Sequence, residues 1–503
     1  MRLQLPLEKC GVFAVFSKID EDVFPYLYWG LLSLNHRGHQ SFGFATMCKG
    51  RIAAYRKLGL VPSISPRELP QWVKRLPGRM GIGHVRYATS GVMSKESLEK
   101  DAQPIVAERE RFCLSIAFNG NLVNLSELSN LLGNKYKNNP GHFSDARIMV
   151  NLLASLFQNN DPIEAIKEYM KVAEGAYSVV GLTSKNELFI FRDPLGIRPL
   201  CYGHSEDGKI IAFSSESVGL DINEFTHSSE VEPGKAILVS NGREINEEKI
   251  IDSNRRAFCS FEFAYFARPD SILGGRYVYE IREEFGRNLA REYSEIAKKV
   301  DLIISVPETA DDVAYGFHEE TGTRWERAIR RHRYVTHRAF ILSPEERKRI
   351  LAKKLNILGS KIRGKKIALI DDSIVRGDTT RSLVKKLKAI GADEVHIFVT
   401  FPRILSPCFY GIDMATYKEL IGAFYEPDKI AEIIGANSVN YQPINSFVKA
   451  TGFKKEDLCL GCLTGKYPTP LAQKIADEIK SMVVRGYVET GRVYETVIGG
   501  SSS

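Results

Sequence analysis

The sequence has 503 residues, enough for two or three domains of ordinary size, and its 44% hydrophobic and 26% charged residues are typical of a globular protein. The longest apolar runs, such as residues 176–182, are too short to cross a membrane, and the N-terminus lacks the apolar stretch of a secretory signal. Eight cysteines are too few for a disulfide scaffold, and a net charge of +8 suits either an acidic small molecule or nucleic acid. We therefore expect a cytoplasmic protein without membrane contact.

About the first 240 residues contain short runs of β-forming residues separated by helical patterns such as residues 163–172. Strands interleaved with helices in this way predict an α+β layered domain. Residues 232–257 resemble a closing hairpin followed by a linker, so we place a domain boundary near residue 255. The predicted strands lie at residues 11–16, 79–84, 113–119, 176–182 and 188–192.

A series of short motifs follows Cys10, which opens the first predicted strand. Taken singly, each motif has an ordinary explanation: a core cysteine, a surface arginine, an Asn-Gly turn or a helix cap. Together and in this order they resemble the N-terminal-nucleophile glutamine amidotransferases. The motifs are His36-Arg37-Gly38, Gly83-His84-Val85-Arg86-Tyr87-Ala88-Thr89, Phe118-Asn119-Gly120-Asn121-Leu122 and Ser144-Asp145.

This resemblance implies a four-layer αββα glutaminase domain over residues 10–255. Residues 1–9 would be a leader that is removed, so that Cys10 supplies both the thiol nucleophile and a free α-amine to accept its proton. Asn119 and Gly120 would stabilise the oxyanion. The remaining roles assigned by resemblance are binding of the glutamine carboxylate by Arg86, binding of its ammonium by Asp145, and support from Arg37. His39 stands where the family often has glutamine.

The densest basic stretch is residues 324–338, with six arginines in fifteen residues. A solvated face rarely needs so many, so a phosphate-rich ligand nearby is the favoured interpretation, with RNA binding the weaker one. Because no long basic block is interleaved with aromatic residues, we expect no nucleic-acid partner. The arginines are Arg324, Arg327, Arg330, Arg331, Arg333 and Arg338.

The second half changes to alternating helices and strands, which predicts an α/β domain with a parallel sheet over residues 256–470. A final helix and a flexible tail are expected over residues 471–503. The predicted elements are a helix at residues 278–296, strands at 301–306 and 365–370, a helix at 379–390 and a strand at 394–400.

A polar loop joins the strand at 365–370 to the helix at 379–390. It begins with two adjacent carboxylates, Asp371 and Asp372, and ends at a helix N-terminus, whose free N–H groups and dipole favour phosphate. Like charges repel, so the two acids suit a ribose diol and a Mg²⁺ ion rather than direct phosphate contact. An acidic strand end with a helix cap is the simpler alternative.

The loop resembles the signature of type I phosphoribosyltransferases. The family usually has threonine at the position of Asp378, and proline at the position of Ile357. Ile357 lies in a basic segment, residues 342–363, that resembles the family's mobile flap. The phosphoribosyl pyrophosphate ligands implied by this resemblance are Asp371, Asp372, Ser373, Arg376, Gly377, Thr379, Thr380 and Lys354 of the flap, with Mg²⁺ at Asp371 and Asp372.

Four further cysteines, Cys259, Cys408, Cys459 and Cys462, lie in three distant segments. The Cys-x2-Cys pair alone could be a zinc knuckle, a redox pair or neither. The four positions together match the iron–sulfur branch of the glutamine phosphoribosylpyrophosphate amidotransferases. That match implies a structural [4Fe–4S] cluster, and a Zn²⁺ site is the alternative.

The resemblance to this amidotransferase family extends from Cys10 to about Pro468. It implies synthesis of phosphoribosylamine from glutamine and phosphoribosyl pyrophosphate, the first committed step of purine synthesis. It also implies a homotetramer inhibited by purine nucleotides. Two alternatives stay open: a glutaminase-linked enzyme that aminates another sugar phosphate, and a paralogue without activity that only senses phosphoribosyl pyrophosphate or nucleotides.

Overall fold

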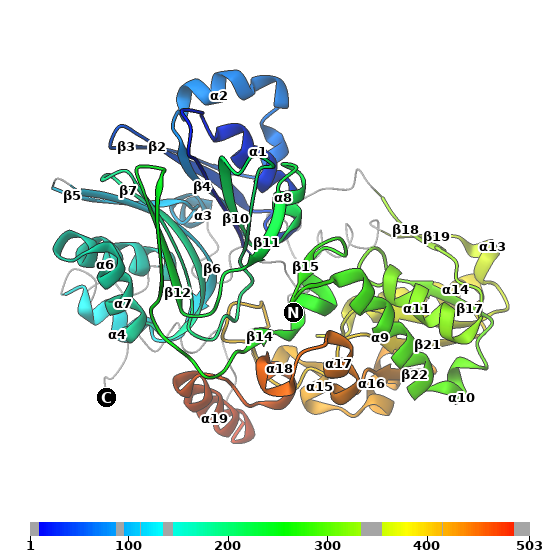
Figure 1. The fold of residues 1–503 in the computed structure, drawn as a ribbon. Helices are drawn as coiled ribbons and strands as arrows, with labels where there is room; N and C mark the ends of the chain where they lie inside the picture. Colours follow the sequence, from blue (N-terminus) through cyan, green and yellow to red (C-terminus); the bar gives the residue numbers. More distant parts are fainter. Residues whose placement is uncertain are drawn as a thin grey trace.

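The computed structural model describes residues 10–86, 95–110, 112–133, 144–332, 355–414 and 416–486. Two lobes lie side by side, and the strands of the N-terminal lobe form two stacked sheets (Figure 1). The predicted leader at residues 1–9 and the tail at 487–503 lie outside the described residues. No helix in the described ranges is long and apolar enough to cross a membrane.

The N-terminal lobe consists of two antiparallel sheets with helices on their outer faces. In spatial order, the first sheet contains β11 (Thr226–Glu230), β9 (Cys201–His204), β10 (Ile210–Ser214), β1 (Gly11–Ser17), β4 (Met80–Arg86), β2 (Ser41–Cys48) and β3 (Arg51–Leu58). The second contains β13 (Glu244–Lys249), β12 (Lys235–Ser240), β8 (Glu187–Arg192), β7 (Gly175–Thr183), β6 (Phe112–Leu122) and β5 (Ile105–Arg109).

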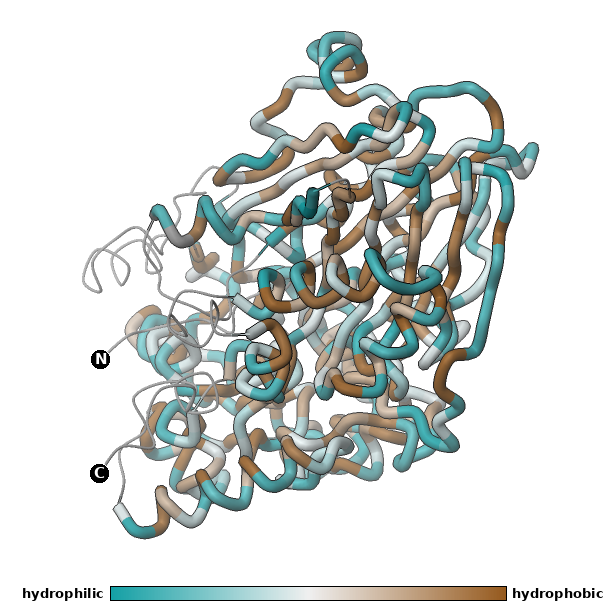
Figure 2. Tube along the Cα trace, turned by 90° about the vertical axis from the view of Figure 1, so that its left-hand side faces the viewer, coloured by the Kyte–Doolittle hydropathy of each residue, from teal (hydrophilic) through white to brown (hydrophobic). Residues whose placement is uncertain are grey.

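Alternation along the strands explains the layers. Val12 and Ala14 of β1 pack between the two sheets, whereas Phe13 and Val15 pack under the outer helices. Figure 2 shows long hydrophobic stretches along strands that end in hydrophilic turns. The expected αββα arrangement is therefore confirmed. The helices are α1 (Phe24–Ser33), α2 (Leu69–Arg75) and α8 (Val218–Asp221) on one side, α4 (Leu125–Leu131), α6 (Asp145–Asn159) and α7 (Pro162–Val172) on the other, and α3 (Lys95–Lys100).

The C-terminal lobe contains a four-stranded parallel sheet, which confirms the expected α/β fold. The strands, in spatial order, are β17 (Leu302–Ser305), β20 (Lys366–Asp371), β21 (Glu394–Val399) and β22 (Ser438–Tyr441). One face packs on α9 (Val278–Glu292), α11 (Asp311–Thr321) and α17 (Ile444–Thr451). The other packs on α13 (Gly359–Ile362), α14 (Asp378–Ile390) and α16 (Pro427–Ile434).

Shorter elements join the lobes. The expected boundary near residue 255 falls between β13 and β14, and stays a prediction because the lobes share extensive contacts. Asn121 of β6, for example, donates a hydrogen bond of 3.1 Å to the Phe409 carbonyl. The elements are β14 (Phe258–Cys259), the hairpin β15 (Ile272–Leu273) and β16 (Arg276–Tyr277), α10 (Ser294–Ala297), β18 (Ile329–Arg331), β19 (Leu355–Ile357), α15 (Ile421–Phe424), β23 (Leu458–Cys459), α18 (Gly461–Thr464) and α19 (Pro470–Val484).

One predicted element is wrong in extent. The helix expected over residues 278–296 ends at Glu292 and resumes as α10, because Tyr293 leaves the helical conformation at φ −112° and ψ 38°. The Tyr293 hydroxyl donates a hydrogen bond of 2.7 Å to the Tyr441 carbonyl at the end of β22. A tertiary contact thus interrupts a sequence whose local pattern favours one helix.

Candidate active site

Cys10 immediately precedes β1, the central strand of the first sheet, and is half-buried. Its carbonyl oxygen accepts a hydrogen bond of 3.2 Å from Arg37 Nε. The other guanidinium nitrogens of Arg37, a fully buried residue, donate to Glu216 and Glu262. Because protein groups engage all three nitrogens, this geometry favours Arg37 as a support for Cys10 over direct contact with glutamine.

Asn119 lies in β6 on the second sheet and is fully buried. Ala117, two residues earlier, packs between the sheets beside Val12, so the period of the strand points Asn119 toward the face that carries Cys10. Neither side-chain polar atom of Asn119 has a hydrogen-bond partner among the described residues. An unpaired buried amide costs about 1–3 kcal/mol, so this group is placed for a ligand.

Gly120 follows Asn119 with φ +150°, a backbone conformation that residues with a side chain rarely adopt. A Cβ atom added here would lie 1.8 Å from the Ala176 carbonyl oxygen on β7. Glycine is therefore required at this position, and the backbone around the expected oxyanion donors is held rigidly by the sheet.

His84, in the motif that precedes Arg86, pairs with Val12 across β4 and β1. Its Nε2 lies 3.1 Å from the Phe118 carbonyl, and its ring is fully buried. Burial, and then the charge of Arg86, lower the pKa of His84 to about 3. The neutral ring therefore donates to the carbonyl just before Asn119, a supporting role that the sequence did not indicate.

Arg86 and Asp145, the expected glutamine ligands, are both buried and lie near a shared acidic residue. Arg86 Nη2 is 3.8 Å from Asp101 Oδ2, and Ser144, just before Asp145, donates 3.0 Å to Asp101 Oδ1. Asp101 also pairs with Arg147 at 2.9 Å. Sequence reasoning missed Asp101, because it belongs to no motif and reaches the others only through the fold. Residues 87–89 of the same motif lie outside the described residues.

The two carboxylates of the phosphate loop lie where β20 ends, and both are buried. Burial, together with the negative charge of Asp372, raises the pKa of Asp371, and burial also raises the pKa of Asp372. The hydroxyls of Thr309 and Ser373 donate to Asp372 at 2.6 and 2.7 Å, and that of Thr380 donates to Asp371 at 3.3 Å. A cation between the acids would relieve their mutual repulsion.

Thr309 was not expected in this site. It follows β17, which is the parallel neighbour of β20, and residues just beyond the carboxyl ends of parallel strands meet at one edge of the sheet. That position in the chain is the signal that could have identified it.

The helix after the loop begins as expected for a phosphate cradle. Gly377 is the N-cap of α14 with φ +80°, and Asp378 is the first helical residue. Thr379 is exposed and Thr380 is buried. Arg376 forms an ion pair with Glu419, which lies in a segment near Cys408. Lys354, the expected flap residue, lies outside the described residues.

The described residues include the first part of the arginine-rich stretch, up to residue 332. Arg324 pairs with Glu326, and Arg327 lies 3.4 Å from Asp311 at the start of α11. Arg330 and Arg331 are exposed on β18. Arg333 and Arg338 lie outside the described residues, so the expected phosphate ligand stays a prediction.

The four cysteines of the predicted cluster are all buried. Cys259 and Cys459 pair directly in the parallel register of β14 and β23. Burial raises the pKa of Cys462, and the nearby thiols of Cys408, Cys459 and Cys259 add to that rise, so the four cysteines lie in one buried region. In the described ranges, no group of three or more His, Cys, Asp or Glu side chains is arranged to hold a metal ion.

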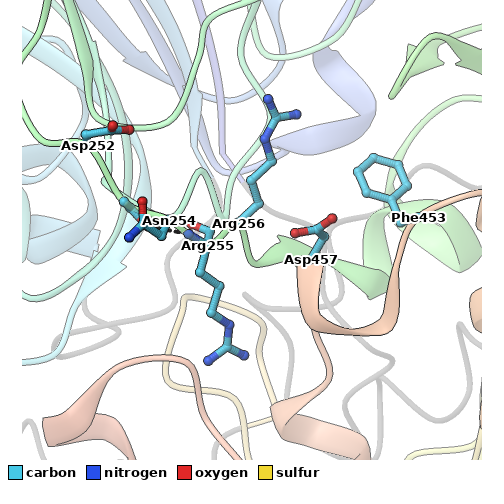
Figure 3. Close-up of a pocket in the computed structure, with 7 residues that line it drawn as sticks. Asp252, Asn254, Arg255, Arg256, Phe453 and Asp457 are labelled. Carbon is cyan, nitrogen blue, oxygen red and sulfur yellow. Dashed lines mark hydrogen bonds between the residues drawn. The ribbon is translucent and has the colours of Figure 1, made fainter.

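A surface pocket of about 370 Å³ lies at the linker between the lobes (Figure 3). Arg255 and Arg256 point to opposite sides, and the acidic residues Asp252 and Asp457 also line the pocket. None of the predicted site residues lines this pocket.

Comparison with known proteins gives the same picture. A glutamine amidotransferase domain family matches residues 90–221. The chain is 36% identical over 472 residues to amidophosphoribosyltransferase of Methanothermobacter thermautotrophicus, covering 93% of this chain and 96% of the relative. The Bacillus subtilis enzyme is 33% identical over 474 residues, covering 93% and 95%.

Solved structures agree. The glutamine phosphoribosylpyrophosphate amidotransferase of B. subtilis, in complex with ADP and GMP, superimposes with a TM-score of 0.79 and 32% identity, covering 92% of this chain and 98% of that one. A structure of the allosteric regulatory enzyme of purine biosynthesis gives a TM-score of 0.80, also at 32% identity, with 92% and 97% covered. The chain therefore belongs to the amidophosphoribosyltransferase family.

Proposed function

We propose that this chain makes 5-phosphoribosylamine, pyrophosphate and glutamate from glutamine, phosphoribosyl pyrophosphate and water, the first committed step of purine synthesis. The observation that carries the proposal is the pairing of two sites in one chain. One lobe holds Cys10 and the unpartnered amide of Asn119 on facing sheets, and the other holds a buried acid pair beside the N-terminus of α14.

In the glutaminase half, the Cys10 thiol attacks the side-chain amide carbon of glutamine. With residues 1–9 removed, the α-amine of Cys10 accepts the thiol proton and returns it to the departing ammonia. The Asn119 side chain and the Gly120 N–H stabilise the oxyanion that forms. Water then hydrolyses the thioester and releases glutamate.

Arg86 and Asp145 are the proposed partners of the glutamine α-carboxylate and α-ammonium. Both are buried charges, and a buried charge favours a partner of opposite sign. Arg86 is 3.8 Å from Asp101, longer than a good hydrogen bond, so its guanidinium can turn to a substrate carboxylate. Arg37 is proposed as a positioning residue rather than a ligand.

In the transferase half, ammonia displaces pyrophosphate from the ribose. The 5-phosphate is proposed to bind the loop and the N-terminus of α14, with Ser373, Gly377, Thr379 and Thr380 as donors. Asp371 and Asp372 would bind the ribose diol and hold Mg²⁺, which neutralises the leaving pyrophosphate when bound. The acids fit that role because burial already disfavours their negative charges without a cation. Arg376 and Lys354 are proposed as further phosphoribosyl pyrophosphate ligands, because the family resemblance implies this role for both.

The four buried cysteines are proposed to hold a structural [4Fe–4S] cluster. Thiolates are the ligands that such clusters take, and each cysteine binds a different iron, so the sulfurs need not converge on one point. A single Zn²⁺ ion would require such convergence, and the described side chains do not provide it. This comparison favours the cluster over zinc.

The protein is proposed to be a cytoplasmic homotetramer. Purine nucleotides are proposed to inhibit it. The support for nucleotide binding is the related B. subtilis structure, which contains ADP and GMP. Neither nucleic acid nor membrane is proposed as a partner.

One assay separates this function from its alternatives. Glutamate release is measured with and without phosphoribosyl pyrophosphate, and phosphoribosylamine is measured in the same reactions. Both products are expected. Glutamate without phosphoribosylamine would indicate a different sugar phosphate acceptor, and neither product would indicate a sensor without activity.

A further inference from the structure

A network of buried charges crosses the junction between the two lobes. Three of its members come from the N-terminal lobe, and the fourth opens a π-helical turn, Glu262–Phe266, that follows β14. The side chains of all four are fully buried. The members are Arg37, Arg198, Glu216 and Glu262.

Glu262 accepts hydrogen bonds from both terminal nitrogens of Arg37, at 2.8 and 3.0 Å, which is a bidentate pair. Arg198 Nη1 lies 3.1 Å from the same carboxylate. With Glu262 present, two guanidinium groups face two carboxylates and the charges balance. Without it, Arg198 would lose this charged partner and Arg37 would keep only Glu216, and a buried charge that loses its partner is strongly destabilising.

Arg37 links Glu262 to the nucleophile, because its Nε donates a hydrogen bond of 3.2 Å to the Cys10 carbonyl oxygen. The guanidinium is planar, so fixing its two outer nitrogens also fixes the direction of Nε. Glu262 is thus one residue removed from the backbone of Cys10, although it belongs to the opposite lobe.

The N-terminal lobe also supplies a carboxylate that accepts hydrogen bonds from the opposite lobe. Glu216 of the N-terminal lobe accepts from the backbone N–H of Arg268 at 2.9 Å and from the Ser271 hydroxyl at 2.6 Å. Burial alone would raise the pKa of Glu216, but His36 and Arg37 outweigh it and hold the pKa well below its usual range. The ionised carboxylate of Glu216 therefore binds residues 268–271 through these two hydrogen bonds and holds them close to Arg37.

The turn that carries Glu262 is anchored in the C-terminal lobe. Arg282 of α9, a buried residue, donates to the Phe263 carbonyl at 2.9 Å and to the Ala267 carbonyl at 2.7 Å. Arg282 also lies within electrostatic range of Asp372 in the phosphate loop. Glu262 is therefore positioned by the same lobe that carries the acid pair.

We infer that Glu262 is a positioning residue for the glutaminase nucleophile, supplied by the phosphoribosyltransferase lobe: through Arg37 it sets the orientation of Cys10. The inference rests on the proposed function, and it assigns to Glu262 a role in a reaction whose other residues lie in the opposite lobe. Glutamine use then depends on how the lobes are docked, whereas the use of free ammonia does not.

The test compares Glu262→Gln with Glu230→Gln in the full-length protein. Glu230 is a matched control, because it also crosses the junction, accepting from the Gly274 N–H at 2.8 Å, yet its contacts do not include Cys10 or Arg37. In Glu262→Gln, kcat with glutamine is expected to fall by about 10- to 100-fold, since displacement of a reacting group by about 1 Å costs that much. Ammonia-dependent synthesis should stay within about twofold in both variants, as should glutamine use in Glu230→Gln.

A second measurement separates positioning from loosening of the fold. The rate of Cys10 alkylation by iodoacetamide is followed against pH; Glu262→Gln should change this profile and Glu230→Gln should not. Glu262→Asp, which keeps the charge but shortens the side chain, should reproduce the loss of kcat, and it replaces Glu262→Gln if that variant does not fold. Arg37→Lys combined with Glu262→Gln should lose no more than the worse single variant, because the two residues act as one unit.

Full glutamine use and an unchanged alkylation profile in Glu262→Gln, beside an active wild-type enzyme, would overturn the inference and leave the proposed function intact. Equal losses in Glu262→Gln and Glu230→Gln would also overturn it, since the junction as a whole would then be responsible. An inactive wild-type enzyme would instead contradict the proposed function.

Discussion

A fully buried amide loses its hydrogen bonds to water, and Asn119 gains none from the described residues in return. Such a group lowers stability unless a ligand satisfies it. In the proposed mechanism, its position on the sheet that faces Cys10 explains why the cost is tolerated: the donor would be in place before the oxyanion forms, so no reorganisation would be needed during the reaction.

Asn119→Ala should therefore lower kcat with glutamine by about 10²- to 10³-fold, the usual loss of one oxyanion donor. The melting temperature should stay the same or rise, because no hydrogen bond of the folded state is removed. Steady-state kinetics and thermal unfolding measure the two effects. Ammonia-dependent synthesis serves as the control. A variant that is destabilised but still uses glutamine at the wild-type rate would show that Asn119 has a structural role only.

The ionisation of His84 depends strongly on the fold. Its pKa falls from 6.5 to about 3, mainly through burial and then through Arg86. Between these values the unfolded chain binds a proton that the folded protein excludes, so acid favours unfolding in this window.

Compared with His84→Gln, the wild-type protein should lose about 2 kcal/mol of stability between pH 7 and pH 5. Urea unfolding of both proteins at the two pH values provides the measurement. Parallel losses in wild type and variant would mean that His84 is not buried as the neutral form.

At the scale of elements, α14 combines the proposed phosphate cradle with an acidic first residue. Asp378 stabilises the helix because a negative charge favours the positive end of the dipole, yet the same charge opposes a bound phosphate. The two effects act in opposite directions on stability and on binding, and this makes them separable.

Asp378→Thr should lower the KM for phosphoribosyl pyrophosphate several-fold while lowering stability by about 0.3–1 kcal/mol. Rates with glutamine and with ammonia should change alike, because both use the same phosphate site. If KM rises in the variant, the carboxylate contributes to binding rather than opposing it.

Elements with a strong local signal were predictable from the sequence. The strands at β1, β7 and β20 coincide with apolar runs, and α14 ends at Gly391 in the left-handed conformation. The break in the helix at Tyr293 was not predictable from the sequence, because it is caused by a hydrogen bond from the Tyr293 hydroxyl to a strand 148 positions away. For the same reason Thr309, Asp101 and Glu262 were missed: each joins the site by tertiary contact, and none belongs to a motif.

At the scale of the whole molecule, the segment around Cys408 connects both lobes. The carbonyl of Phe409 accepts from Asn121 of the glutaminase sheet at 3.1 Å, and the Ile421 N–H donates to the Val375 carbonyl in the phosphate loop at 2.8 Å. A metal group at the four cysteines would close long loops and hold this segment, so its loss should loosen both sites.

Anaerobically purified protein should be brown and contain roughly four irons and four sulfides per chain. Exposure to oxygen should then lower the melting temperature and both activities without modification of Cys10. Metal analysis, visible absorption and thermal unfolding test this. Colourless, fully active protein with stoichiometric zinc would establish the alternative site.

The most direct test of the central claim follows the nitrogen atom itself. Wild-type protein and Cys10→Ala are incubated with phosphoribosyl pyrophosphate, unlabelled ammonia and glutamine that carries heavy nitrogen in its side-chain amide, and phosphoribosylamine is analysed by mass. The wild-type product should contain the heavy nitrogen, and the Cys10→Ala product should form only from free ammonia. Heavy nitrogen in the product of the Cys10→Ala variant, or no phosphoribosylamine from the wild-type protein, would contradict the account.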